Sequence, residues 1–383
     1  MTIYEFRPIA LTLENIGPFT NPYEINFVHE NGQPCNFYML VAPNGFGKTT
    51  VFNTFTSLIS LLGTENPKNY GQEDLDSGRG RAQLDILIRV HWEGRDHQFI
   101  LSILAGCSNT DLSLKVWSKN DLQKHQSEHW YRCGYFNRVA GKLEPLISNS
   151  SNDFVADFLT VIQTSIDTSP EHFGESLYHG PTLMYFSAYR DIPPININSQ
   201  RNITKAAHWG YQTVHRFMPH DETWSYSLDN LLFWLKWLDD GRFEKARDLI
   251  NKQLFYSSEK HLEDVRREPP EAIIRCTDES THRLDRLSSG EKNLLQLFLR
   301  IGTHMTQNTI VLIDEFDVHL HLRWQHKLFN ALKAFATDNP GVTVMITTHS
   351  VEILDTYVNT LNIIEKGKER ELIKGGHLIE DLK

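Results

Sequence analysis

The segment from Phe37 to Leu62 constrains the fold of this chain more than any other part of the sequence. Its first part, Phe37–Val41, is a short continuous apolar run, which is typical of a strand buried on both faces. After a loop, apolar residues recur at helical spacing from Thr49 to Leu62. The loop between them reads Ala42-Pro43-Asn44-Gly45-Phe46-Gly47-Lys48-Thr49-Thr50. Because its glycines let backbone N–H groups turn inward beside a helix N-terminus, the pattern predicts a phosphate-binding loop.

Individual side chains of this loop have the chemistry that a bound nucleotide requires. Lys48 can reach the β- and γ-phosphates of ATP, and the Thr49 hydroxyl can coordinate Mg²⁺. The first position of such a loop is normally glycine and is Ala42 here, a change small enough for the loop to form. The other residues expected to bind the nucleotide are Asn44, Gly45, Phe46, Gly47 and Thr50.

A second motif consists of an apolar strand that ends in two carboxylates. Thr309–Ile313 reads as a buried strand, and Asp314 and Glu315 follow it directly. A buried parallel strand delivers such residues to the carboxyl edge of the sheet, where nucleotides bind in open α/β folds. We expect Asp314 to hold Mg²⁺ together with Thr49, and Glu315 to orient the attacking water as general base.

The remaining pattern predicts an α/β fold with a mixed sheet. Alternating apolar residues predict one strand over Ala82–Trp92 and a second over Phe99–Ile103. The two strands are expected to form an antiparallel hairpin. Residues 105–180 are polar and read as an insertion of loops and helices, with a helical segment over about 205–265. After it, strands and helices alternate, which indicates a mainly parallel sheet. Further expected elements are strands at Ile9–Glu14, Tyr23–Val28, Thr182–Phe186 and Val342–Thr347, and helices at Leu294–Ile301 and Trp324–Phe335.

A third motif, Leu287-Ser288-Ser289-Gly290-Glu291-Lys292, begins a helix for which Ser288 is a suitable N-cap. A fourth, Thr347-Thr348-His349-Ser350, follows the second motif. The four motifs in this order resemble the ABC-type ATPase head that the SMC, RecF and OLD-like groups share. The resemblance implies the fold class, an α/β ABC-type P-loop ATPase head with a mixed sheet and an inserted helical lid subdomain.

The resemblance also implies how the site is completed. In such families two heads meet face to face, so Ser288, Ser289 and Gly290 would contact the γ-phosphate held by the opposite subunit. His349 would contact the γ-phosphate of its own chain and act with Glu315 and Lys48 in catalysis. ATP and Mg²⁺ are the implied cofactors, and a homodimer or a higher homo-oligomer formed through the ATP sites is the implied assembly.

Some positions stay open at this stage. Asp317 with His319 and His321 replaces the transporter-type segment after the carboxylates, and the two histidines are either metal ligands or, as the resemblance favours, part of the loop at the dimer seam. Arg190 is a candidate phosphate or partner sensor or simply a surface residue. Gln72 and Gln83 both qualify as the glutamine that such heads place near the metal.

The expected domain division follows the motifs. Residues 1–104 form the first part of the ATPase head, and residues 281–383 form its second part. Residues 105–280 form the inserted lid and helical subdomain, from which a strand returns to the head near 182–190.

Composition bears on partners and location. The formal net charge of −10 argues against a whole surface devoted to DNA, and the basic cluster Gly78–Arg81 reads as a solvated loop. The four cysteines form no CxxC pair, and no apolar run is long enough to cross a bilayer. We therefore expect a cytoplasmic protein without a membrane partner, and binding of nucleic acid stays open.

The function implied by the resemblance depends on what the chain lacks. The segment from Thr50 to Ser288 is too short for long coiled-coil arms, and the segment after His349 is too short for a nuclease module. Such a standalone head resembles the ATPase subunits of bacterial anti-phage systems such as PARIS, Septu and retrons. We expect an ATPase that senses a signal and regulates a separate effector protein, a nuclease or a toxin. The alternatives are a RecF-like DNA clamp, a transporter subunit and a metabolic P-loop enzyme such as a kinase.

Overall fold

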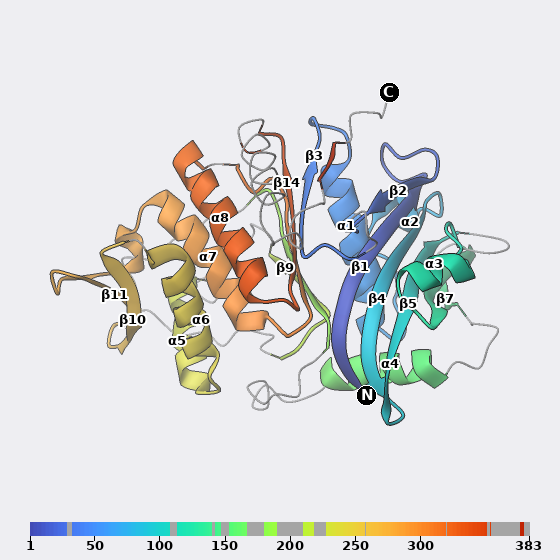
Figure 1. The fold of residues 1–383 in the computed structure, drawn as a ribbon. Helices are drawn as coiled ribbons and strands as arrows, with labels where there is room; N and C mark the ends of the chain where they lie inside the picture. Colours follow the sequence, from blue (N-terminus) through green and yellow to red (C-terminus); the bar gives the residue numbers. More distant parts are fainter. Residues whose placement is uncertain are drawn as a thin grey trace.

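Two six-stranded sheets and one three-stranded sheet organise the chain (Figure 1). The computed structural model describes residues 1–28, 33–107, 113–139, 142–146, 153–166, 180–189, 210–217, 227–256, 258–318, 320–350, 353 and 376–378. No helix within these residues has both the length and the apolarity to span a membrane.

The first six-stranded sheet is parallel throughout and carries the motifs. Its order is β15 (Gly376–Leu378), β3 (Phe37–Val41), β14 (Thr343–Thr348), β13 (Thr309–Ile313), β8 (Thr182–Phe186) and β9 (Val214–Phe217). Each neighbouring pair is parallel. β14 therefore lies between β3 and β13, so the loops that leave these three strands meet at one edge of the sheet.

The central strands of the parallel sheet, β3, β8, β13 and β14, are buried at every position, and most of their residues are apolar. In β13, Ile310 and Leu312 point into one core, and Val311 and Ile313 point into the other. The first core contains α1 (Lys48–Ser60), which lies between the two large sheets (Figure 1). The second core contains helices on the opposite face: α5 (Leu228–Leu238), α6 (Arg242–Ile250), α7 (Ser289–His304) and α8 (Leu322–Asp338).

The second large sheet is mostly antiparallel and covers α1. Its order is β2 (Tyr23–Asn26), β1 (Thr2–Glu14), β4 (Arg81–Trp92), β5 (Arg95–Gly106), β6 (His129–Val139) and β7 (Lys142–Pro145), with only β5 and β6 paired in parallel. Short helices α2 (Glu73–Asp76) and α3 (Lys119–Lys124) and the longer α4 (Asp153–Ile166) accompany it.

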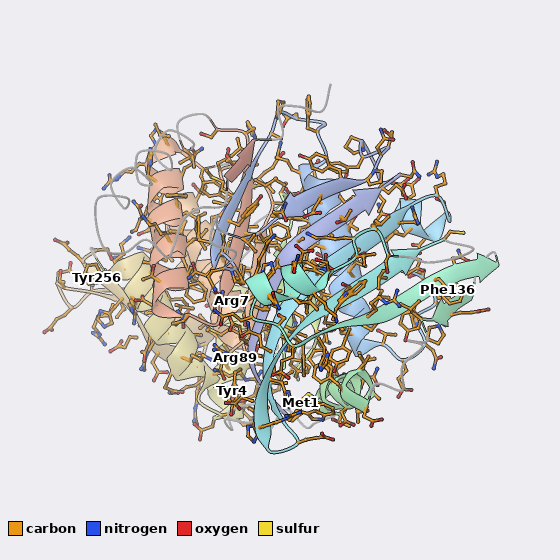
Figure 2. All side chains as sticks on the ribbon, turned by 45° about the vertical axis from the view of Figure 1, so that its right-hand side comes forward. Met1, Tyr4, Arg7, Arg89, Phe136 and Tyr256 are labelled. Carbon is orange, nitrogen blue, oxygen red and sulfur yellow. The ribbon has the colours of Figure 1, made fainter. Side chains whose placement is uncertain are left out.

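β1 joins the two large sheets through polar contacts. The Arg7 guanidinium donates hydrogen bonds to the Val342 carbonyl (3.0 Å) and to the Thr343 hydroxyl (2.9 Å). The Asn308 amide donates to the Ile3 carbonyl (3.0 Å). Figure 2 labels Arg7 near the middle of the molecule, with Phe136 and Tyr256 toward opposite ends.

Several elements differ from the sequence-based expectation. The segment read as helical up to about residue 265 ends in a hairpin of β10 (Lys260–Arg267) and β11 (Pro270–Cys276), to which β12 (Thr281–His282) is added. These strands are rich in charged residues and pack on α5 through one face only, so their periodicity is weak. The short strand β9 and the strands β6 and β7 were also missed, and the domain boundaries at 104 and 280 remain predictions.

Candidate nucleotide-binding site

The phosphate loop lies between β3 and α1, as the sequence predicts. Gly45 and Gly47 have φ of 85° and 89°, values that side-chain-bearing residues rarely adopt. A Cβ atom on Gly47 would lie 2.7 Å from the Pro18 side chain and 2.8 Å from the Phe19 ring, whereas one on Gly45 would meet nothing within 4 Å. Gly47 therefore packs against the protein, and Gly45 borders open space where an anion can approach the backbone.

Lys48 is buried at the start of α1, with its ammonium folded back over the loop. Its Nζ donates to the Ala42 carbonyl (2.8 Å) and to the Pro43 carbonyl (3.2 Å). Burial lowers the pKa of the Lys48 ammonium from its ordinary value, while nearby carboxylates, led by Glu315, act in the opposite direction. The ammonium is thus held between the loop and the carboxylates that follow β13.

Asp314 is the centre of the hydrogen-bond network at the sheet edge. The Thr49 hydroxyl donates to Asp314 Oδ2 (2.6 Å), and the Thr347 hydroxyl donates to Asp314 Oδ1 (2.6 Å). Asp314 is 1% exposed, and its backbone N–H donates to the Phe186 carbonyl (2.9 Å). Three strands and α1 therefore orient one carboxylate beside two hydroxyls, and oxygen ligands of this kind are those that Mg²⁺ prefers.

Glu315 is the second residue after β13, where the chain turns away from the sheet. Its φ is 44°, in the left-handed region, and its backbone N–H donates to the Thr347 hydroxyl (2.7 Å). The next residue, Phe316, donates its N–H to the Thr347 carbonyl (3.1 Å). Strained backbone of this kind persists where the surroundings hold it, and such positions cluster at functional sites.

His349 follows β14 at the same edge. Its side chain is 45% exposed, and its Nδ1 lies 4.0 Å from Oδ2 of Asp317, which is 4% exposed. The other carboxylate oxygen of Asp317 has no hydrogen-bond partner within the described residues. His349 of the fourth motif therefore lies close to Asp317, in the turn that follows the carboxylates of the second motif.

The third motif is on the other face of the parallel sheet. Ser288 caps α7 in a capping box: its hydroxyl accepts from the Glu291 N–H (3.3 Å), and Glu291 Oε2 accepts from the Ser288 N–H (2.8 Å). Ser288 and Ser289 are exposed, whereas Gly290 is buried. Because α1 and α7 pack in different cores, the sheet separates the body of α7 from the phosphate-loop helix of the same chain.

Other candidate residues have structural partners or lie outside the described residues. The Gln83 side chain donates to Asp85 Oδ1 (2.8 Å) and accepts from the Leu114 N–H (2.8 Å). Gln72 caps α2 by accepting from the Leu75 N–H (2.8 Å). Neither contact identifies a metal-proximal glutamine, and Arg190 and His319 fall outside the described residues.

The basic cluster Gly78–Arg81 pairs with acids of the same chain. Arg79 lies 3.2 Å from Asp74 Oδ1, and Arg81 lies 2.5 Å from Glu14 Oε2. Arg79 is exposed, as expected for a solvated loop, but Gly80 is buried and Arg81 begins β4, so the interpretation is wrong for the second half of the cluster.

Thr347 is a site residue whose role the sequence analysis missed. It was quoted within the fourth motif, but its hydroxyl bridges Asp314 and the Glu315 backbone. The available signal was its position at the end of a buried strand next to the strand that bears the carboxylates.

The fold and the site together are those of an α/β protein in which a buried strand, a glycine-containing loop and a helix lie beside a buried carboxylate. Comparisons with known proteins show similarity to an AAA family and to one curated ATPase over parts of the chain. The family described as "AAA domain, putative AbiEii toxin, Type IV TA system" matches residues 195–355. A relative in Escherichia coli, "Retron Ec83 probable ATPase", is 31% identical over 125 residues, which are 29% of this chain and 22% of that protein. The chain thus matches only about a fifth of that relative's length.

Two SMC heads are among the solved structures that the chain matches. The SMC head domain from Thermotoga maritima is 14% identical, with a TM-score of 0.39 over 91% of both chains. The SMC head bound to the C-terminal winged-helix domain of ScpA is 10% identical, with a TM-score of 0.42 over 90% of both chains.

Proposed function

We propose that this chain binds ATP with Mg²⁺ at the Lys48 loop and hydrolyses the bond between the β- and γ-phosphates. The observation that carries the proposal is the Asp314 network, in which Thr49 of the phosphate loop and Thr347 of β14 donate to one buried carboxylate. The donor set fits the metal, because a hydroxyl and a carboxylate supply only oxygen atoms. The open space at Gly45 fits a phosphate next to the backbone N–H groups.

Each side chain of the proposed site has a separate task. Lys48 exchanges its two loop carbonyls for phosphate oxygens and neutralises the charge that develops on them. Glu315 orients the attacking water and accepts its proton. His349 binds the γ-phosphate from the end of β14. Thr49 and Asp314 would hold Mg²⁺, which would supply further charge neutralisation at the phosphates.

We also propose that a second copy of the chain completes the site. Ser288 and Ser289 are exposed at the N-terminus of α7, and Gly290 is buried behind the Trp324 ring. A helix N-terminus favours an anion, so this end of α7 suits the γ-phosphate of a partner chain. ATP would then hold two heads together, and hydrolysis would release them.

Replacement of Glu315 by glutamine tests the proposal. We expect Glu315→Gln to bind ATP normally and to hydrolyse it at least about a hundredfold more slowly, because the general base is lost. In ATP the variant should sediment as a dimer, and Lys48→Ala should prevent both binding and dimerisation. Glu93→Gln is the matched control, since Glu93 also has a positive φ of 50° but lies in the β4–β5 turn. Normal turnover by Glu315→Gln would show that another group acts as the base.

We further propose that the ATP-bound dimer controls a separate effector protein in defence against phage. The support is the family match, which includes a putative toxin system, and the resemblance to an ATPase of a retron. The dimer trapped by Glu315→Gln is the form in which to test this, by co-expression with the product of the adjacent gene. Salt-sensitive, ATP-dependent DNA binding without an effector complex would instead favour a DNA clamp.

A further inference from the structure

The first turn of α8 contacts the turn that follows the Glu315 segment. The Gln325 amide donates to the Asp317 carbonyl (3.1 Å) and to the Leu320 carbonyl (2.9 Å). Both acceptors belong to the loop that connects β13 to α8. Because one amide group of α8 binds two carbonyls of this loop, the conformation of the loop depends on the position of α8.

The same turn of α8 contacts the helix that begins with the third motif. The Trp324 indole packs against Gly290, where an added Cβ would lie 2.5 Å from the ring. Lys327 Nζ lies 5.0 Å from the centre of the same ring and donates to the Leu254 carbonyl (2.7 Å). The indole is therefore held between the start of α7 and a lysine that is itself anchored to η4 (Asn251–Phe255).

These contacts connect the chain's own proposed nucleotide site with the α7 N-terminus, which is proposed to bind the nucleotide of a partner chain. Asp317, whose carbonyl binds Gln325, has its carboxylate 4.0 Å from His349 of the same chain. Gly290, which contacts Trp324, belongs to the motif proposed to bind the nucleotide of the partner chain. Adjacent residues of α8 thus contact the chain's own site and the surface that it offers to a partner.

We propose that Trp324 and Gln325 are positioning residues that couple the chain's own nucleotide site to its α7 N-terminus. The inference rests on the proposed function. When the Asp317 turn shifts on ATP binding, Gln325 moves with it, and Trp324 transmits the displacement to Gly290. The exposed Ser288 and Ser289 are then aligned for a partner only when the chain's own site is filled.

Two variants remove one contact each. Gln325→Leu keeps the size of the side chain but removes one donor from each of the two carbonyls. Trp324→Leu removes the ring from Gly290. We expect each to lower kcat about tenfold while the Kd of a fluorescent ATP analogue changes less than about twofold, because the phosphate loop is untouched. In the Glu315→Gln background, each should also weaken the ATP-dependent dimer in sedimentation experiments.

Two control variants show whether the effects are specific to the contacts of α8. Gln123→Leu and Trp237→Leu replace exposed residues of the same types and should behave as the wild type. A lowered Tm with unchanged kcat at low temperature, for either variant, would mean that the contacts are only structural and would overturn the inference. If Gln325→Leu does not fold, the kcat and dimerisation of Trp324→Leu test the inference. Failure of the wild type itself to hydrolyse ATP would overturn the proposed function instead.

Discussion

Thr347 shows how much of the site depends on a single hydroxyl group. The hydroxyl donates to the Asp314 carboxylate, which can only accept, and accepts from the Glu315 N–H, which can only donate. The Asp314 carboxylate and the Glu315 N–H therefore determine the position of the Thr347 hydroxyl proton. Because the side chain is fully buried, both partners would lose their hydrogen bond without gaining water if the hydroxyl were removed.

We expect Thr347→Val to lower kcat about tenfold or more and to lower the free energy of unfolding by about 1–3 kcal/mol, since valine has the same shape but no hydroxyl. ATP turnover and urea unfolding measure the two effects. Thr343→Val, in the same strand, loses one hydrogen bond from Arg7 and serves as the control. It should be destabilised but fully active per folded molecule, and equal loss of activity in both variants would contradict the role of Thr347.

At the scale of elements, the β4–β5 pair of the antiparallel sheet contains a buried polar group. Asp85 of β4 accepts from the Ser102 hydroxyl and from Gln83 Nε2 (2.8 Å). Ser102 in turn accepts from the Trp130 indole N–H (2.7 Å). Burial raises the pKa of Asp85 from 3.8 to about 6, although these hydrogen bonds lower it. The sheet thus buries a carboxyl group that ionises near neutral pH.

The raised pKa of Asp85 predicts a pH-dependent contribution to stability. Between pH 3.8 and about 6 the folded chain binds this proton more tightly than the unfolded chain, so the contribution is present at low pH and is lost as the pH rises. Relative to the wild type, Asp85→Asn should gain about 1 kcal/mol of unfolding free energy between pH 5 and pH 8. Urea unfolding at several pH values measures this, with exposed Asp248→Asn as the control. A difference that does not vary with pH would show that Asp85 does not titrate in this range.

At the scale of the whole molecule, the parallel sheet separates the two halves of the proposed ATP site. α1 packs on the face that the antiparallel sheet covers, and α7 packs on the other face with α5, α6 and α8. The exposed Ser288 and Ser289 therefore face outward at the end of a helix whose body is remote from α1. A two-fold symmetric contact between copies would create two equivalent sites at once, because each copy supplies both surfaces.

Mixing two inactive variants tests this arrangement. Lys48→Ala removes the phosphate contact, and Ser289→Arg blocks the α7 N-terminus, so each variant alone should be inactive. In an equimolar mixture each mixed dimer has one intact site of two, so activity should return, up to about one half of the wild-type value if all dimers are mixed. Phosphate release measures it. A mixture as inactive as its components would contradict completion of the site by a partner, and Lys48→Ala mixed with itself is the control.

Local sequence determined much of this protein because its main motifs are contiguous in the chain. The phosphate loop, the strand that ends at Asp314 and the helix capped by Ser288 all lie where their sequence patterns predict. Such elements are specified by short-range rules: apolar runs, glycine φ angles and capping groups. The hairpin of β10 and β11 escaped prediction because strands with charged exposed faces have no comparable local signal.

Tertiary structure alone decided which side chains meet. Thr49, Asp314 and Thr347 lie far apart in the sequence, and they join because β14 lies between β3 and β13. Likewise, nothing local indicates that Trp324 contacts Gly290. The physical reason is that strand order and helix packing result from burial of apolar faces over the whole chain, whereas a sequence pattern reports only which face of each element is apolar.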